Sequence, residues 1–325
     1  MFAFLYPGQG SQQPGMGQFL FENFKIAQTT FEEASDAIKI DMKKLCFHGS
    51  VEELAMTENT QPALLTVSTA TTRVITSEFG AKARIGAGHS IGEYGALVAA
   101  GVIEFAPAVK AVRTRGQAMQ SAVPVGQGGM VAVMGLSESQ VIQLCSYVEK
   151  ESGFTPLSPA NYNSPGQIVI SGSMKAIEWM RANAKAENIW PTETPRLKLI
   201  PLNVSAPFHC AMMKPAEDEM RKVLSDMPFQ LPAFQIIQNF TAAVETHPEA
   251  LRENLIRQVS GPVKWMQSME LLKKQGVSQC LELGTGKVLQ GLLKKIDSEF
   301  FQVLNANSLE DLKMIEKIAK PQGAI

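Results

Sequence analysis

The chain has 325 residues, of which 45% are hydrophobic and 19% are charged. This length and balance indicate one or two folded domains with a large core, and they exclude intrinsic disorder over most of the chain. The 30 Lys and Arg residues nearly cancel the 31 Asp and Glu residues, giving a net charge of −1. The charge therefore offers no electrostatic argument for binding nucleic acid or an anionic membrane.

The cysteines and histidines do not form a metal-binding pattern. No pair of the four cysteines has CxxC spacing, and none of the four histidines lies in a His/Cys cluster, so we expect no metal site. Scattered cysteines are typical of thiols in a reducing cytoplasm. The N-terminus lacks a basic region, and polar residues interrupt every long uncharged stretch. We therefore expect a cytoplasmic protein without a targeting segment or a membrane span.

The first 126 residues predict alternating strands and helices. An apolar run at 2–6, ended by Pro7-Gly8, predicts a buried strand and a glycine-rich loop at 8–12. Asn59-Thr60-Gln61-Pro62 is typical of a helix start with proline in the first turn. Beyond these we expect helical structure over 18–38, a helix to about 78, a strand at 84–87, and helices at 93–100 and 107–121.

The order of elements changes at residue 127. Up to 202 we expect strand 129–134, helix 137–150, strands 155–162 and 166–171, helix 173–188 and strand 196–202. This βαββαβ order predicts a ferredoxin-like small subdomain at 127–202, inserted into a larger α/β unit formed by 1–126 and 203–325. The larger unit then continues with helix 211–226, strand 235–239, helices 248–259 and 264–275, and strand 278–283.

The pentapeptide Gly88-His89-Ser90-Ile91-Gly92 fits the pattern Gly-x-Ser-x-Gly. Small residues on both sides of a serine permit a sharp strand-to-helix turn that exposes the hydroxyl, and the following helix directs its first N–H groups to the same place. The predicted strand before Ser90 and the predicted helix after it favour this interpretation. The alternative is a tight glycine turn with a bystander serine.

A nucleophilic serine needs a base. His89 adjoins Ser90, but neighbours in such a turn point apart. His209, in a loop after a predicted strand, is the better candidate. The alternative is a structural histidine satisfied by backbone groups. We interpret His48 and His247 as loop residues without a chemical role.

Arg115 is predicted to face the interior. On its helix the residues three and four positions away are all apolar: Ala111, Val112, Ala118 and Met119. A buried arginine needs a partner. That partner is either an internal carboxylate, in a structural ion pair, or the carboxylate of a substrate, whose geometry matches the planar guanidinium.

Two glycine-containing loops could bind ligands through their backbone. Gln9 lies between Gly8 and Gly10, where a backbone N–H could serve as an oxyanion donor, although a plain turn explains the pattern equally well. The segment 284–287 (Gly-Thr-Gly-Lys) follows a predicted strand but lacks the rest of a phosphate-binding loop.

Taken together, these segments resemble the malonyl-CoA:acyl carrier protein transacylases of fatty acid synthesis and the acyltransferase domains of polyketide synthases. The resemblance spans nearly the whole chain. It is carried by seven ordered motifs: residues 6–12 (YPGQGSQ), 59–63 (NTQPA), 88–94 (GHSIGEY), 115–120 (RGQAMQ), 161–167 (NYNSPGQ), 207–209 (PFH), and 257–258 (RQ) with 262–265 (PVKW).

The resemblance implies an α/β-hydrolase-like core with a parallel sheet and assigns catalytic roles. Ser90 would be the nucleophile and His209 its general base. The backbone carbonyl of Gln258 would hold the His209 tautomer. The backbone N–H groups of Gln9 and Ile91 would form the oxyanion hole.

The resemblance also implies the substrates. Arg115 would bind the malonyl carboxylate, with Gln9, Phe208, Asn161 and Asn163 as further substrate-binding residues. Malonyl-CoA and acyl carrier protein would be the partners, and neither a metal nor a cofactor would be needed, because the CoA thioester is a substrate. The carrier is acidic in this family, so exposed basic residues could dock it: Lys43, Lys44, Lys110, Arg113 and Lys287.

The expected function is thus malonyl transfer to acyl carrier protein for fatty acid synthesis, through a malonyl-serine intermediate. The first alternative is a trans-acting acyltransferase that loads a polyketide synthase carrier. A thioesterase or lipase is a second alternative, against which an inward cation such as Arg115 argues. A catalytically silent scaffold is a third; it predicts loss of the serine or histidine, and both are present.

Overall fold

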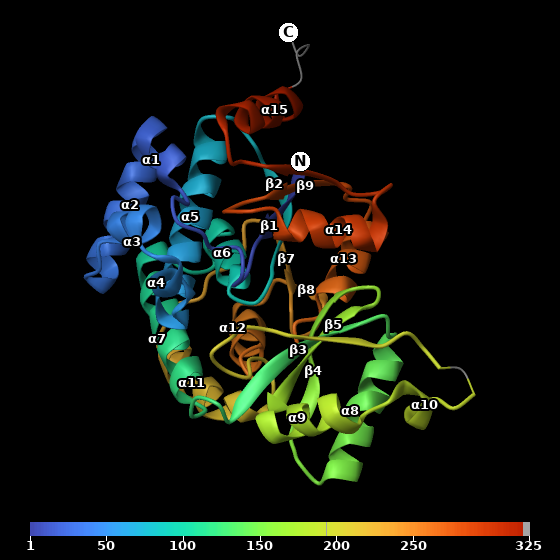
Figure 1. The fold of residues 1–325 in the computed structure, drawn as a ribbon. Coiled ribbons are helices and arrows are strands. Elements are labelled where there is room, and N and C mark those ends of the chain that lie inside the picture. The colour runs from blue at the N-terminus through green and yellow to red at the C-terminus, as the bar shows by residue number, and fades with distance from the viewer. Residues whose placement is uncertain (193, 321–325) are drawn as a thin grey trace.

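The computed structural model describes residues 1–192 and 194–320 and has a mixed α/β fold with two sheets (Figure 1). The larger sheet has the strand order β10-β9-β1-β2-β7-β8. Its strands are β1 (Phe2–Tyr6), β2 (Ala83–Gly88), β7 (Gln235–Gln238), β8 (Ala243–Glu245), β9 (Gln279–Glu282) and β10 (Gln302–Asn305). All neighbours in it are parallel except β8, which runs antiparallel to β7.

Strand β1 lies in the middle of this sheet and is buried along its whole length. Its side chains alternate between two hydrophobic cores. Phe2, Phe4 and Tyr6 belong to one core, the Phe4 core, and Ala3 and Leu5 belong to the other, the Leu5 core. A central parallel strand covered on both faces is expected to be apolar throughout, which explains the uninterrupted run at the N-terminus.

Helices cover both faces of the larger sheet (Figure 1). The Phe4 core receives side chains from α1 (Gln18–Asn23), α2 (Lys25–Ile38), α3 (Met42–His48), α4 (Val51–Ala55), α5 (Thr57–Ser77), α6 (Gly92–Ala99), α7 (Phe105–Ser121), α11 (Lys214–Ser225), α12 (Pro248–Arg257) and α15 (Leu309–Ala319). The Leu5 core receives α13 (Trp265–Lys274) and α14 (Val288–Asp297). The ends of β1 and β2 are thereby held rigidly between two helical layers.

The smaller sheet is antiparallel, with the strand order β4-β5-β3-β6. Its strands are β3 (Gly128–Met134), β4 (Leu157–Ser164), β5 (Gln167–Ser173) and β6 (Lys198–Pro201). Helices α8 (Glu138–Ser152) and α9 (Met174–Asn183) pack on it and share a third core with it, while α10 (Ala186–Ile189) is short and contributes no buried residue. Figure 1 shows these elements, in green and yellow, at one end of the molecule.

The expected strands at 2–6, 84–87, 129–134, 155–162, 166–171, 196–202, 235–239 and 278–283 are confirmed within two residues at each end. Three expected helices are interrupted. Residues 18–38 divide at Phe24, which is extended; residues 173–188 divide into α9 and α10; and residues 211–226 open with a 3-10 turn, Ala211–Met213. His48 ends helix α3, so its assignment to a loop was wrong.

The helix at Pro62 begins earlier than expected. Helix α5 starts at Thr57, so Pro62 lies inside it rather than in its first turn. Proline has no N–H, and the carbonyl of Glu58, four residues earlier, therefore lacks its helical partner. Arg113 on α7 donates to this carbonyl at 3.1 Å. A side chain from a neighbouring helix thus compensates for the proline.

All four cysteines are free and buried. In residues 1–192 and 194–320, no helix combines the length and apolarity needed to cross a bilayer, and no three His, Cys, Asp or Glu side chains form a group suited to a metal ion.

Candidate active site

Ser90 lies at a sharp turn between β2 and α6. Its φ of 53° is in the left-handed region, a strained conformation for a residue with a side chain. The flanking glycines are required by space. A Cβ on Gly88 would lie 2.0 Å from the carbonyl carbon of Gly92, and a Cβ on Gly92 would lie 2.1 Å from the carbonyl oxygen of Tyr6. The turn predicted from the Gly-x-Ser-x-Gly spacing is confirmed.

Ser90, His209 and the backbone at Gln258 form a hydrogen-bonded chain. The Oγ of Ser90 lies 2.7 Å from Nε2 of His209. On the other side of the ring, Nδ1 lies 2.8 Å from the carbonyl oxygen of Gln258 and 3.2 Å from that of Gly261. Carbonyl oxygens only accept, so Nδ1 carries the proton and Nε2 is left to accept the proton of Ser90.

His209 is held in its neutral form. The side chain is 4% exposed. Burial, together with the Arg115 cation nearby, lowers the pKa of His209 from 6.5 to about 3. Near neutral pH the imidazole is therefore unprotonated at Nε2, as a general base must be.

Arg115 reaches the same site from α7 and is 1% exposed, as its apolar neighbours predicted. Its Nη1 donates to Oε1 of Gln61 at 2.9 Å, and its Nη2 donates to Oε1 of Gln258 at 2.9 Å and to Oγ of Ser90 at 3.3 Å. These partners are all neutral, and no acidic group of the described residues forms an ion pair with it. The alternative of a structural ion pair is therefore wrong, and a buried cation is left beside Ser90.

The side chain of Gln258 links the cation to the serine turn. Its Oε1 accepts from Arg115, while its Nε2 donates to the carbonyl of Ser90 at 3.0 Å and to Oε2 of Glu93 at 3.1 Å. Glu93 is fully buried and also accepts from the backbone N–H of Asn239 at 2.7 Å. Burial raises the pKa of Glu93 to about 7, and the hydrogen bonds that it accepts oppose that rise.

Asn239 holds the two sides of the turn together. Its Oδ1 accepts from the N–H of Ser90 at 2.7 Å, and its Nδ2 donates to the carbonyl of Gly88 at 2.6 Å. Neither Asn239 nor Gln61 was given a role from the sequence. Gln61 lay in a quoted motif without an assigned function. Asn239, after β7, carried no sequence signal, because only the sheet brings it beside β2.

Two backbone N–H groups remain available near Ser90. Those of Gln9 and Ile91 donate to no backbone carbonyl among the described residues. Both residues line a cavity of about 110 Å³ together with Ser90, His209 and Arg115. The other residues that line it are Gln61, His89, Met119, Met130, Asn161, Leu202, Val204 and Phe208.

Of the remaining expected site residues, some line this cavity and others lie outside it. Phe208 and Asn161 line the cavity, whereas Asn163 does not and instead lies with its Oδ1 2.8 Å from Nε2 of His89. His89 thus points toward the smaller sheet, which supports His209 as the base. Arg113, expected as a docking residue, is already bound to Glu58 at 3.6 Å.

Known proteins resemble this chain over nearly its whole length. Residues 3–295 match the acyl transferase domain family. The malonyl CoA-acyl carrier protein transacylase of Salmonella typhimurium is 44% identical over 91% of this chain and 92% of its own length. The structure of the corresponding transacylase from Coxiella burnetii has a TM-score of 0.90 and 37% identity, covering 97% of this chain and 96% of that one.

A further similar structure is a malonyl-transacylase in complex with the acyl-carrier protein of a type II polyketide synthase. It has a TM-score of 0.89 and 40% identity, covering 98% of this chain and 99% of that one. From the matched domain and these full-length relatives, this chain belongs to the acyl transferase family that contains the malonyl-CoA:acyl carrier protein transacylases.

Proposed function

We propose that this protein transfers the malonyl group from malonyl-CoA to the phosphopantetheine thiol of acyl carrier protein, in support of fatty acid synthesis. The observation that carries the proposal is the buried Arg115 guanidinium, 3.3 Å from Ser90 Oγ. A carboxylate bound there is a short distance from the carbon that Ser90 attacks. A three-carbon diacid thioester, whose carboxylate is one methylene from the thioester carbonyl, fits this separation.

The first half-reaction acylates Ser90. His209 Nε2 accepts the Ser90 proton as Oγ attacks the thioester carbonyl. The N–H groups of Gln9 and Ile91 donate to the resulting oxyanion. The C–S bond then breaks, the imidazolium returns its proton to the CoA sulfur, and malonyl-Ser90 remains. Protein groups supply both the proton transfer and the oxyanion stabilisation, so this chemistry requires neither a metal nor a redox cofactor.

The second half-reaction reverses the same steps with a different thiol. The carrier thiol gives its proton to His209 and its sulfur attacks the malonyl ester. The C–O bond breaks, Ser90 recovers the proton, and malonyl-carrier protein leaves. The neutral side chains of Gln61 and Gln258 keep Arg115 in place throughout without competing for its charge. Two substrates that use one site in turn give ping-pong kinetics.

Phe208 supports a preference for malonyl over methylmalonyl. Its ring lines the cavity of about 110 Å³ and leaves little room for an α-methyl group. One methyl group in a pocket discriminates by about 10- to 200-fold. Asn161 lies in the same cavity as a further substrate-binding residue, and Asn163 supports the site through His89.

Loading a polyketide synthase carrier is a second candidate. It is favoured by the similar malonyl-transacylase that is paired with such a carrier. For either carrier, the exposed residues Lys43, Lys44, Lys110 and Lys287 remain candidates for docking. A panel of fatty acid and polyketide carriers separates the two functions by their relative kcat/KM.

We also propose the finer description of the fold. The larger sheet supports an α/β-hydrolase-like unit formed by 1–126 and 203–325. The order β4-β5-β3-β6, with α8 between β3 and β4 and with α9 and α10 between β5 and β6, supports a ferredoxin-like unit at 127–202. Four free thiols support a cytoplasmic location.

Intact-mass measurement tests the proposed function. The purified protein is mixed with malonyl-CoA beside the Ser90→Ala variant. We expect the wild type alone to gain the mass of one malonyl group and to lose it when holo-acyl carrier protein is added. Arg115→Ala should lose most malonyl loading, because the carboxylate then has no cation.

Two results would contradict the proposal. No adduct in the wild type, with malonyl-CoA intact, would favour a silent scaffold. Rapid release of CoA by the wild type without any adduct would favour a hydrolase.

A further inference from the structure

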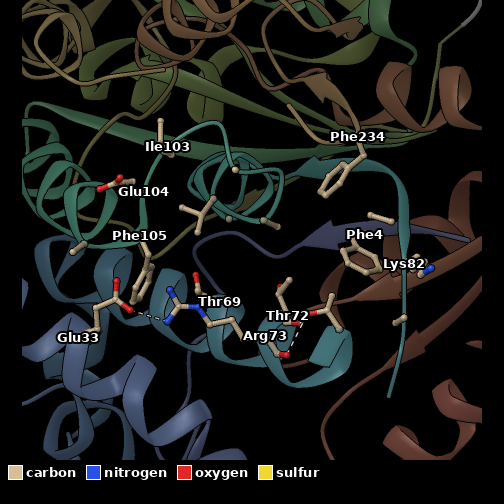
Figure 2. Close-up of a pocket in the computed structure, with 18 residues that line it drawn as sticks. Phe4, Glu33, Thr69, Thr72, Arg73, Lys82, Ile103, Glu104, Phe105 and Phe234 are labelled. Carbon is tan, nitrogen blue, oxygen red and sulfur yellow. Dashed lines mark hydrogen bonds and ion pairs between the residues drawn. The ribbon is translucent and has the colours of Figure 1, made fainter. Parts of the chain in front are cut away.

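A second cavity, of about 840 Å³, lies away from Ser90 and shares no lining residue with the first. It is bounded by β1, the start of β2, and the helices α5, α6 and α7 (Figure 2). Helices α5 and α7 carry Gln61 and Arg115 at other points along their length, and α6 begins directly after the Ser90 turn. Nothing in the proposed malonyl transfer uses this cavity.

Small residues create the space. Helix α6 presents Gly95 and Ala99 to the cavity, and Ala83, Gly101 and Ala106 line it from the neighbouring segments. Gly95 is glycine because a Cβ there would lie 2.8 Å from the ring of Tyr6. The helix therefore packs closely on β1 and leaves the adjoining volume open.

Of the eighteen residues that line the cavity, eleven are apolar or glycine, including three phenylalanines, and seven are polar or charged. Phe4, Ile103 and Phe105 are buried, and the ring of Phe234 lies edge-on to that of Phe4 at 6.2 Å between centroids. Concave sites of 300–1,000 Å³ with mostly apolar walls and a few polar groups are typical of small-molecule binding sites. The volume and the walls both fit that class.

Thr69 and Arg73 supply polar groups at one end. They lie one helical turn apart on α5 and so face the same side. The hydroxyl of Thr69 is on a residue only 4% exposed, lines the cavity, and has no hydrogen-bond partner among the described residues. Buried hydroxyl groups nearly always have a partner, so this one indicates a ligand atom or water at that position.

The guanidinium of Arg73 is fixed in place and still has donors to offer. Its Nη1 donates to Thr30 at 3.0 Å and to Glu33 at 2.7 Å, and its carbon lies 4.9 Å from the centroid of the Phe105 ring. Nε and Nη2 donate to no residue in the described ranges. Figure 2 shows Thr69 and Arg73 beside each other at one end, with Phe4 and Phe234 at the other.

We propose that this cavity binds a linear fatty acyl carboxylate. The carboxylate accepts hydrogen bonds from the Thr69 hydroxyl and the open edge of Arg73. Planar guanidinium groups are suited to carboxylates, and Glu33 keeps this one in position. The acyl chain runs between Phe105 and the small residues of α6 toward Phe4 and Phe234. Lys82 is exposed at that far end.

Titration calorimetry with decanoate, below its micelle concentration, tests the site. We expect a stoichiometry of one. Octanoate has two methylenes fewer and should bind about 15-fold more weakly, since each methylene removed from an apolar site weakens binding about fourfold. Methyl decanoate should bind far more weakly than decanoate, because it lacks the charge that Arg73 pairs with.

Two variants locate the binding. Thr69→Val keeps the shape and removes an unsatisfied buried hydroxyl, so it should fold normally and bind decanoate about tenfold more weakly. Ala99→Leu fills the cavity from α6 and should abolish binding. Urea unfolding of each variant confirms that its fold is intact.

A third variant separates this site from the malonyl site. Ser90→Ala should bind decanoate as the wild type does, and malonyl-CoA should not displace decanoate. The result is therefore independent of whether malonyl transfer is found. The proposal is overturned if decanoate does not bind, if Ala99→Leu binds it unchanged, or if malonyl-CoA competes with it. Equal binding of methyl decanoate overturns the assignment of the head group.

Discussion

Two strand–turn–helix junctions of the larger sheet are similar in sequence. They differ in whether a backbone N–H group at the start of the helix lacks an acceptor. At the first, β2 passes through Ser90 into α6. At the second, β9 passes through a Gly-Thr-Gly-Lys segment into α14. Both have glycines in the turn and present the N-terminus of a helix, where backbone N–H groups attract anions.

The second junction supplies its own anion. Glu282, the last residue of β9 and 1% exposed, accepts from the N–H groups of Leu289 and Gln290, each at 2.9 Å. At the first junction the carboxylate of Glu93 is directed instead to Gln258 and Asn239, and the Ile91 amide donates to no backbone carbonyl in residues 1–192 and 194–320. The amides of Gly92, Glu93 and Tyr94 donate to carbonyls of the turn, so among the described residues Ile91 alone offers a backbone N–H beside Ser90 at this junction.

The largest expected effect is at the first junction. Gly92→Ala places a Cβ within 2.1 Å of the Tyr6 carbonyl oxygen, so the turn must shift. A displacement of about 1 Å costs roughly 100-fold in rate when reacting groups must align. We expect the rate of malonyl loading to fall by at least about 100-fold. Quenching the reaction at set times and recording the intact mass measures this rate. Wild-type loading by a folded Gly92→Ala protein would show that the turn tolerates movement.

Removing the internal anion at the second junction should affect stability alone. Glu282→Ala leaves two N–H groups of α14 without their acceptor, at a cost of about 2 kcal/mol in the free energy of unfolding. Glu282→Gln keeps one acceptor oxygen and should cost less. Urea unfolding gives both values. The kcat/KM for malonyl transfer should stay within twofold of wild type, and a large loss would mean that the second junction also serves the reaction.

The contrast between the junctions also explains what the sequence could predict. The strand, turn and helix around Ser90 follow from local rules, namely apolar runs, flanking glycines and a small-residue helix. Arg115 was placed inside by helical spacing alone. The central strands were predicted within two residues because strands buried on both faces leave a continuous apolar run.

Features that depend on distant pairing were not predictable. Asn239 clamps the serine turn only because β7 pairs with β2, and Glu282 caps α14 only through the path of the intervening turn. The early start of α5 places Pro62 inside the helix, and the carbonyl that it leaves without a partner accepts from Arg113 on another helix. The contact of His209 with the Gln258 carbonyl was implied by family resemblance, since no spacing rule relates two loops 49 residues apart.

A smaller effect is expected from a glycine of the second turn. Gly286 has a φ of 81°, and a Cβ there would have its nearest contact at 3.6 Å, so only the left-handed conformation opposes a side chain. That conformation costs about 1 kcal/mol. Gly286→Ala should therefore lower the free energy of unfolding by about that amount and leave malonyl loading unchanged. Gly286→Ala is the matched control for Gly92→Ala, in which a steric clash rather than the left-handed conformation opposes the added side chain.

The smallest expected effect is that of mild acid on the acylation rate. An ordinary histidine of pKa about 6.5 would be about 97% protonated at pH 5, and a base of that kind would lose about 30-fold in rate between neutral pH and pH 5. His209 has its pKa lowered to about 3 by burial and by Arg115, so kcat/KM for malonyl loading should change by less than about twofold. A shallow change in kcat/KM near pH 7 would arise from the titration of Glu93, and the Glu93→Gln variant should not show that change.

The lowered pKa of His209 also makes the free energy of unfolding depend on pH in mild acid, where the acylation rate is expected to change little. In the unfolded chain His209 takes up a proton below about pH 6.5, whereas in the folded protein it does so only near pH 3. Its contribution to stability is therefore complete above pH 6.5 and is lost as the pH falls. At pH 5 the loss is about 2 kcal/mol, because pH 5 lies 1.5 units below the pKa of about 6.5 in the unfolded chain and each unit is worth about 1.4 kcal/mol. Glu93 opposes this loss over the same range, because its raised pKa makes the folded protein take up a proton that the unfolded chain does not. Urea unfolding of the wild type and of His209→Ala at pH 7 and pH 5 therefore gives the His209 loss as the difference between the two proteins. A steep fall in rate, together with the same pH response of stability in the wild type and in His209→Ala, would mean that His209 is solvated and titrates normally, and that the buried, neutral base inferred for the first junction is wrong.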